Sequence, residues 1–285
     1  VTFFGQRISG QVNEQRTTNN EQRTTNNAKA MKLSINQLTY LKSLHQRKFR
    51  QKYRIFIVEG VKMAAEVIGS SGFEVEGAYA VPDWAEANGS LLSGMDDRLH
   101  VVSEADLKKI SLLTTPNQVL LVVKEPDNSP DFGAAGLGLS LFLEDIRDPG
   151  NFGTILRIAD WFGIPWVFCS PDSVEIFNPK VVQASMGAFL RVKCCSLDFM
   201  ELREKMPDVQ VYGAVMDGAP VFDADLTDRA LLVIGNESRG ISPALQPLMQ
   251  HRISIPKGKT GGAESLNAAV AAGILCAAFV RGREG

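Results

Sequence analysis

The stretch from Ile255 to Gly273 constrains the fold more than any other part of the chain. An apolar strand, Arg252 to Ile255, stops at Pro256 and leads into a glycine-rich loop. After this loop, Glu264-Ser-Leu-Asn267 opens a helix of very small residues. Glycines let a backbone approach a ligand closely, and the start of a helix presents unpaired N–H groups. The stretch therefore predicts a small-molecule site at a strand–loop–helix junction.

Two other segments have the same design. Residues 141–159 form an apolar strand, an Asp-Pro-Gly loop and a helix that we expect to begin near Asn151. Residues 230–240 form a strand, a glycine loop and a polar cluster. Open α/β sheets bind ligands at the carboxyl ends of their strands. The three units predict an α/β domain with a parallel sheet, and they place five polar side chains at that edge: Asn151, Arg157, Glu237, Ser265 and Asn267.

In this order, the three segments resemble the motifs of the SpoU/TrmH branch of the SPOUT RNA methyltransferases. The matches are Asp148-Pro-Gly-Asn-Phe-Gly153 with Arg157, Ile234-Gly-Asn-Glu237 with Gly240, and Ile255-Pro256 with Glu264-Ser-Leu-Asn267. The resemblance spans residues 140 to 281. One departure is the loop after Pro256: the family usually has Ile-Pro-Met and a short loop, whereas this chain has Lys257 and a longer loop through Gly258–Gly262.

The resemblance implies a fold, a cofactor and a dimer. The fold is a C-terminal parallel-sheet SPOUT domain with a deep trefoil knot, and the cofactor is S-adenosylmethionine. A homodimer completes each site across its interface. The implied cofactor-binding residues are Gly235, Asn236, Gly240, Ile255, Pro256, Ser265, Leu266 and Asn267.

Each candidate catalytic residue also has a structural interpretation. Asn151 is either a substrate contact or the cap of its helix, and Glu237 is either a substrate contact or a structural loop carboxylate. Ser265 and Asn267 are equally explained as helix caps. Arg157 is either an exposed helix cation or the residue that the family assigns as general base. A guanidinium has a pKa of about 12 or higher, so it stays protonated at neutral pH. We therefore expect Arg157 instead to hold a phosphate and stabilise a developing 2′-alkoxide.

The segment from Lys32 to Arg54 is basic and contains no acidic residue, with tyrosine and phenylalanine interleaved. It is interpreted either as a solvated helix face or as an RNA-binding surface on which bases stack. Beside a methyltransferase domain we favour RNA contact, through Arg47, Lys48, Arg50, Lys52 and Arg54.

The alternation of strands and helices after this segment predicts a smaller α/β domain. We expect strands at 55–60, 75–81, 99–102 and 119–124, and helices at 61–68 and 103–112. The region resembles the L30e/L7Ae-like substrate-binding domain that precedes the catalytic domain in many SpoU-type rRNA methyltransferases. The predicted domains are 31–125 for RNA binding, a 126–138 linker, and 139–285 for methyl transfer.

Residues 1–30 do not resemble a folded element. The sequence from Glu14 to Asn20 is repeated identically from Glu21 to Asn27, and the segment is polar. It is predicted to be a disordered extension or a cloning remnant, with Met31 as a natural start.

Composition narrows the remaining alternatives. Four cysteines without C-x-x-C pairing and only three histidines argue against a metal centre, and no membrane span or signal peptide is visible. We therefore expect a cytoplasmic enzyme that methylates a ribose 2′-hydroxyl of RNA. We favour 23S rRNA as the substrate, because tRNA-type relatives usually lack the N-terminal domain. The alternatives are a tRNA methyltransferase and a non-catalytic RNA-binding or ribosome-assembly protein. A dinucleotide-binding enzyme is disfavoured, because no G-x-G-x-x-G motif follows a strand.

Overall fold

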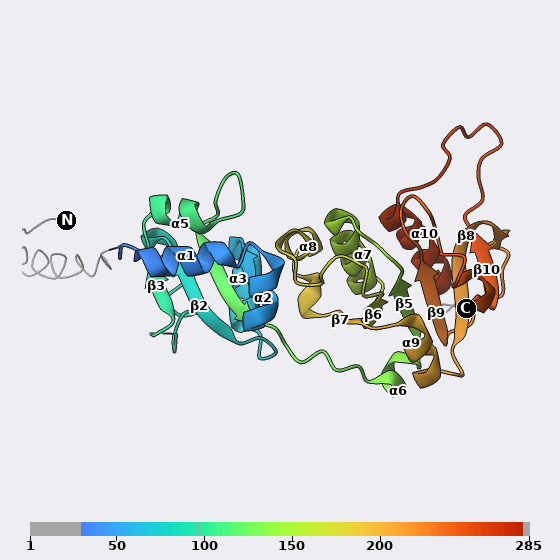
Figure 1. Ribbon diagram of the computed structural model, residues 1–285, viewed down its shortest axis with the longest axis horizontal. Coiled ribbons are helices and arrows are strands. Elements are labelled where there is room, and N and C mark those ends of the chain that lie inside the picture. The colour runs from blue at the N-terminus through green and yellow to red at the C-terminus, as the bar shows by residue number, and fades with distance from the viewer. Residues whose placement is uncertain (1–29, 96, 282–285) are drawn as a thin grey trace, which may run out of the picture.

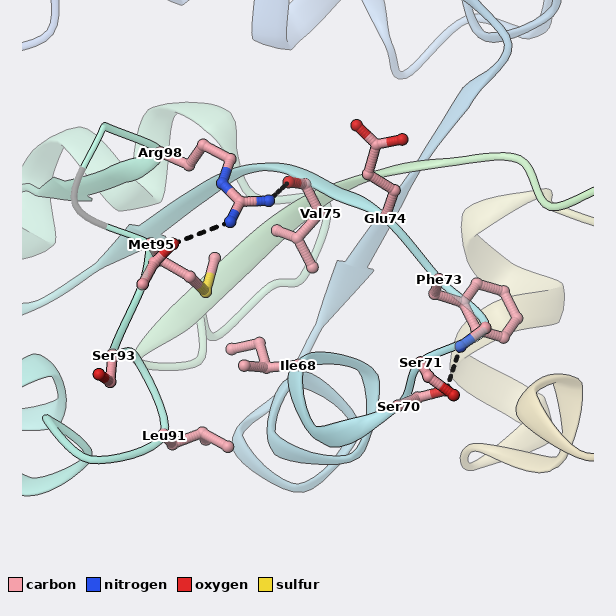
Figure 2. Close-up of a pocket in the computed structure, with 12 residues that line it drawn as sticks. Ile68, Ser70, Ser71, Phe73, Glu74, Val75, Leu91, Ser93, Met95 and Arg98 are labelled. Atoms are coloured by element: carbon pink, nitrogen blue, oxygen red, sulfur yellow. Dashed lines mark hydrogen bonds between the residues drawn. The ribbon is translucent and has the colours of Figure 1, made fainter.

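A computed structural model of the protein describes residues 30–95 and 97–281 and contains two β-sheets (Figure 1). The first sheet has the strand order β1-β4-β2-β3, in which β4 runs antiparallel to β1 and β2 and only β2 and β3 are parallel. The strands are β1 (Ile55–Glu59), β2 (Val75–Ala80), β3 (Leu99–Val101) and β4 (Val119–Lys124). The helices are α1 (Ile35–Ser43), α2 (Arg47–Tyr53), α3 (Val61–Gly69), α4 (Pro82–Ala87) and α5 (Glu104–Ile110).

The second sheet is parallel throughout and has the order β10-β8-β9-β5-β6-β7. Its strands are β5 (Leu139–Leu143), β6 (Trp166–Cys169), β7 (Lys193–Ser196), β8 (Gln210–Pro220), β9 (Ala230–Ile234) and β10 (His251–Ser254). The helices of this part are α6 (Phe132–Ala135), α7 (Pro149–Trp161), α8 (Pro179–Ser185), α9 (Phe199–Lys205) and α10 (Ala268–Arg281), with 3₁₀ turns at Ala188–Leu190 and Gln246–Leu248. This arrangement confirms the predicted α/β fold with a parallel sheet.

The central strands β5 and β9 are buried along their whole length, which explains why their sequences are continuously apolar. Alternate residues serve two cores. Leu141 and Leu143 belong to the core cluster that includes buried residues of α7, α8 and α10, whereas Phe142 packs with Phe199 of α9 in the other cluster. Helices therefore cover both faces of the sheet.

Two helix starts differ from the expected ones. Helix α7 begins at Pro149, because the Asp148 side chain caps it by accepting a hydrogen bond from the backbone N–H of Asn151. Asn151 therefore lies inside the helix and is not its cap. Helix α10 begins at Ala268, after Asn267, whose Oδ1 accepts from the N–H groups of Ala269 and Val270. The loop before α10 is thus longer than expected and includes Ser265.

The two sheets are joined by direct packing as well as by the connecting segment, which contains the short helix α6. The Phe56 ring of β1 stacks on Phe177 with a centroid distance of 4.4 Å and contacts Phe189 edge-on. Figure 1 shows α8 between the N-terminal helices and α7. The N-terminal sheet therefore packs against the side of the parallel sheet that carries α7 and α8.

Some expectations fall outside these observations. The repeated segment lies outside the described residues. The trefoil knot stays a prediction. Within the part of the chain that the structure covers, no helix is long and apolar enough to cross a membrane.

Candidate active site at the carboxyl edge of the parallel sheet

The sheet order places a topological switch point between the ends of β5 and β9. From β5 the chain moves outward through β6 and β7, and it then crosses to the other side of β5 for β8, β9 and β10. Strand order reverses between β5 and β9, and open α/β sheets bind their ligands at such a switch point. The motif loops after β5 and β9 meet there, because the two strands pair in register from Leu139 with Ala230 to Leu143 with Ile234.

Three of the five predicted catalytic side chains form one hydrogen-bonded network at this switch point. Asn151 Nδ2 donates to Glu237 Oε1 at 3.1 Å, and Asn267 Nδ2 donates to Asn151 Oδ1 at 2.8 Å. Glu237 Oε1 also accepts from the backbone N–H of Asp148 at 3.3 Å. We call these three residues the Glu237–Asn151–Asn267 network. It joins all three motif segments, although Asn151 and Asn267 are 116 residues apart in the chain.

The loop after β9 is a closed turn that only glycine permits at two points. A Cβ on Gly235 would lie 2.2 Å from the carbonyl carbon of Gly240, and Gly240 itself has a φ of +67°. The backbone groups of Asn236 and Gly240 bond to each other in both directions, at 3.1 and 2.8 Å. The Asn236 side chain accepts from the N–H groups of Ser238 and Arg239 and donates to the Asp145 carbonyl. Asn236 thus fixes the loop that carries Glu237.

The predicted cofactor-binding residues lie in two different settings. Gly235, Asn236 and Gly240 form the closed turn, Ile255 is half-buried directly after β10, and Asn267 belongs to the network. Pro256, Ser265 and Leu266 are exposed to solvent, and 46% of the surface of Leu266 is accessible. In Figure 1 the connection from β10 to α10 extends away from the sheet before it reaches α10, which packs against α7.

Arg157 and Ser265 are not part of the network. Arg157 lies six residues after Asn151, roughly 9 Å along the helix axis and about 240° around it. Its side chain is exposed and makes no hydrogen bond or ion pair within residues 30–95 and 97–281. Ser265 takes part in no hydrogen bond among the residues that the structure covers. Within the described residues Arg157 therefore makes no bond to the network, and its place in the site stays a prediction.

The basic segment is divided between an exposed and a buried side. Arg47, Lys48, Lys52 and Arg54 are exposed, and the lysine ammonium groups lie over the rings of Phe49 and Tyr53 at 4.9 and 5.2 Å. Four of the five predicted RNA-binding residues therefore remain accessible.

Arg50 is the exception, with only 2% of its surface exposed. Its Nε and Nη2 donate to the two carboxylate oxygens of Glu175 at 3.0 and 2.6 Å, and its Nη1 donates to the Leu44 carbonyl at 2.8 Å. All three guanidinium nitrogens are engaged inside the protein. The expectation that Arg50 contacts RNA is therefore corrected, because this side chain links α2 to the part of the chain that contains the parallel sheet.

Sequence reasoning missed three residues that shape this region. Asp148 could have been recognised as a helix cap, because an aspartate directly before a proline is a strong signal for a helix start. Glu175 gave no such signal, because its partner Arg50 is 125 residues away, and Asp145 gave none, because its partners Arg239 and Asn236 lie more than 90 residues away. Asp145 is one of the non-glycine residues with a positive φ, +54°, and it contacts Arg147 and Arg239 beside the network.

Comparison with known proteins identifies both parts of the chain. Residues 138–277 match the family model described as the SpoU rRNA methylase family, and residues 36–121 match the model of an MRM3-like substrate binding domain. The chain is 30% identical over 237 residues to the 23S rRNA (guanosine(2553)-2'-O)-methyltransferase RlmP of Bacillus subtilis. That alignment covers 82% of this chain and 92% of the relative.

Solved structures agree with these matches. A protein of the TrmH family from Porphyromonas gingivalis superposes with a TM-score of 0.78 at 36% identity, covering 88% of this chain and 99% of that one. The SpoU methyltransferase AviRb from Streptomyces viridochromogenes, solved in complex with AdoMet, superposes with a TM-score of 0.77 at 25% identity. That superposition covers 89% of this chain and 99% of AviRb.

Proposed function

The chain belongs to the SpoU rRNA methylase family, and from that premise we propose that it transfers a methyl group from S-adenosylmethionine to a ribose 2′-hydroxyl of 23S rRNA. The observation that carries the proposal is the Glu237–Asn151–Asn267 network at the switch point of the sheet. Hydrogen bonds hold these side chains of three separate motifs together in a chain that is 30% identical to an rRNA 2′-O-methyltransferase.

The site has the features that a nucleoside cofactor requires. The closed turn from Gly235 to Gly240 offers backbone close to the surface, because no side chain covers Gly240, where even an added Cβ would meet nothing within 4 Å. Gly235, Asn236, Gly240 and Ile255 would hold S-adenosylmethionine, with Pro256, Ser265, Leu266 and Asn267 closing over it. When bound, the cofactor supplies an electrophilic methyl group.

The network residues would orient the target nucleotide. Asn151 is fixed from both sides, since its amide donates to Glu237 and accepts from Asn267, so its position is preorganised. Holding the 2′-hydroxyl in line with the methyl group removes orientational entropy from the reaction. Glu237 keeps Asn151 in place and still has Oε2 available for a substrate donor.

Arg157 would hold the substrate phosphate and stabilise the developing 2′-alkoxide. Its guanidinium stays charged at neutral pH and can form two parallel bonds to a phosphate. The proton of the hydroxyl leaves to water or to a phosphate oxygen. No protein group competes for Arg157 within the described residues, which supports a role in contact with something outside this chain.

A second copy of the chain would complete this site. Trp161 is 84% exposed at the end of α7, and Val270 is 51% exposed on α10. Between the two helices lies a groove of about 550 Å³ lined by Asn151, Thr154, Ile158, Asn267, Ala269, Val270, Gly273 and Ile274. Arg157 is a helical neighbour of Thr154 and Trp161, so a partner covering this apolar face would also contact Arg157. Sedimentation should show a dimer at micromolar concentration; a fully active monomer would contradict this.

The cytoplasm is the expected location for rRNA methylation, and we also propose the trefoil knot that the family resemblance implies. The contact between Asn267 and Asn151 supports the knot, because it requires the chain to return from the edge strand β10 to the middle of the sheet.

The test of the proposed function is mass-spectrometric mapping of 2′-O-methyl groups in rRNA and tRNA from a strain lacking this protein. Loss of one 23S rRNA methyl group is the expected result. A methyl group lost from tRNA would favour the tRNA alternative. No lost methyl group, together with no binding of S-adenosylmethionine, would favour a non-catalytic RNA-binding protein.

A further inference from the structure

Two exposed arginines flank the Glu237–Asn151–Asn267 network, and one aspartate holds both of them. Arg147 Nε donates to Asp145 Oδ1 at 2.7 Å, and Arg239 Nη2 donates to Asp145 Oδ2. Both arginine side chains are 66% exposed, whereas the aspartate side chain is only 16% exposed. Asp145 therefore bridges two guanidinium groups that face the solvent.

The backbone of Asp145 is held in an unusual conformation by hydrogen bonds. Asp145 has a φ of +54°, a conformation that costs a non-glycine residue on the order of 1 kcal/mol or more. It persists because its N–H donates to Ser170 Oγ at 2.9 Å, and because its carbonyl accepts from Asn236 Nδ2 at 2.8 Å. The same Asn236 orders the loop that carries Arg239. The two arginines are thus oriented relative to one another by the loops after β5 and β9.

Most donors of the two arginines remain unused. Arg147 uses only Nε and Arg239 only Nη2, so within the described part of the chain the remaining guanidinium nitrogens donate to no protein group. Arginine forks match the oxygen geometry of a phosphate, and a single carboxylate balances only one of the two positive charges. An anion that joined the pair would displace water rather than protein partners.

The carboxylates around the pair are largely engaged elsewhere. Asp148 caps α7 by accepting from Asn151 N at 2.8 Å, and Glu237 Oε1 accepts from Asn151 and from the N–H of Asp148. Asp145, through its hydrogen bond and its charge, raises the pKa of Arg147, and the charges of the exposed Asp172 and of Glu237 raise it further. These neighbours keep Arg147 charged.

The pair also lies beside the proposed reaction centre. Arg147 directly precedes Asp148, whose N–H donates to Glu237, and Arg239 follows Glu237 by two residues. We propose that Arg147 and Arg239 form a two-armed site for an RNA backbone phosphate next to the target nucleotide, with Asp145 as the positioning residue. This inference rests on the proposed function and adds to it a phosphate contact separate from Arg157.

The test compares Arg147→Gln, Arg239→Gln and the double variant of the full chain with the wild type. The probe is an unmodified 23S rRNA transcript, and binding is measured by filter retention over a salt series without cofactor. Each single variant should weaken binding roughly 5- to 10-fold, and the double variant roughly 30- to 100-fold. The salt slope should fall by roughly 0.7 to 0.9 for each lost phosphate contact. Affinity for S-adenosylmethionine, measured by calorimetry, should stay within about two-fold.

A matched control is Arg252→Gln. Arg252 is also exposed and paired with an aspartate, Asp217, at 2.5 Å, but it has no contact with the network. It should bind RNA as the wild type does. If the control and the double variant lose the same affinity, or if the double variant keeps the wild-type salt slope, the phosphate site is wrong. A wild type that binds RNA but neither binds the cofactor nor methylates the transcript would refute the proposed function and leave this comparison valid.

Asp145→Asn tests the positioning role separately. Asparagine tolerates a positive φ, so the loop should keep its conformation. The two arginine charges remain, so we expect an unchanged salt slope with a roughly 5-fold loss in kcat/KM, because the forks are no longer held. Tighter RNA binding by this variant would show that Asp145 competes with the phosphate, and would overturn the positioning role.

Discussion

The sequence predicted functional polar residues in two regions, the carboxyl edge of the parallel sheet and helix α2. The two regions differ in how their side chains are arranged. At the edge, side chains from three distant segments bond to one another. On α2 and at Arg54 directly after it, five basic residues within eight positions are divided, because Arg50 is buried against Glu175 while the other four stay exposed.

This difference shows which side-chain positions can be predicted from a sequence. Parallel strands all end at one edge of their sheet, so a polar residue just after a strand has a defined location. A helix of seven residues has sides that face different surroundings, and nothing local states which side another domain will cover. Arg50 and Glu175 are 125 residues apart, so only the three-dimensional structure reveals their pairing.

Replacing Arg50 should produce the largest effect of the predicted changes, a loss in the free energy of unfolding. A small loss would contradict the difference between the buried and exposed sides of α2. Arg50→Ala leaves the Glu175 carboxylate, which is only 11% exposed, without its principal partner. Breaking such a pair costs about 3 to 5 kcal/mol in the free energy of unfolding. Urea unfolding of the full chain measures this cost.

The exposed neighbour Arg47 provides the control for Arg50. Its Nε lies 4.0 Å from the same carboxylate, yet its side chain is 58% exposed, so Arg47→Ala should cost less than about 1 kcal/mol. Equal losses for the two variants would mean that α2 has no buried side in solution.

Arg157 tests the edge region. Arg157→Ala should leave folding and cofactor affinity nearly intact and reduce the methylation rate by ~10²-fold or more, the scale of one lost electrostatic contact in the transition state. Arg157→Lys keeps the charge but loses the planar fork, so it should restore little. Single-turnover methylation of rRNA is the measurement.

Two outcomes would change the assignment of Arg157. A fully active lysine variant means that any cation suffices at this position. A fully active alanine variant means that Arg157 is a surface charge and that the proposed mechanism fails.

The exposed side of α2 should give a smaller effect on RNA binding. Exchanging Lys48 and Lys52 for glutamine should weaken RNA binding roughly ten-fold and lower the salt slope by roughly one to two, because each lysine gives up a phosphate contact. The melting temperature should not change, in contrast to Arg50→Ala. An unchanged salt slope would remove α2 from the RNA-binding surface.

Much of the fold and part of the site were thus available from the sequence. The strands β1, β5 and β9 are apolar runs with a glycine at one end. Because β5 and β9 are parallel neighbours, the polar residues that follow them meet at the switch point. The start of α7 was misplaced because Asn151 was considered as the cap instead of Asp148. The Asp145 bridge could not be predicted, because it depends on a positive φ and on arginines from two loops.

The smallest expected effect lies beside the buried pair, at Glu125. Burial, followed by the nearby Glu175 carboxylate, raises the pKa of Glu125, although Arg54 and Arg50 oppose this shift. An acid whose pKa is higher in the folded state favours folding below its unfolded pKa, about 4.3, and loses that contribution as pH rises through the folded value. Glu125→Gln should therefore raise the melting temperature slightly at pH 7 and leave it unchanged near pH 4. A variant that is less stable at pH 7 would mean that the Glu125 carboxylate is needed by the arginines, and that the ion pair of Arg50 extends beyond Glu175.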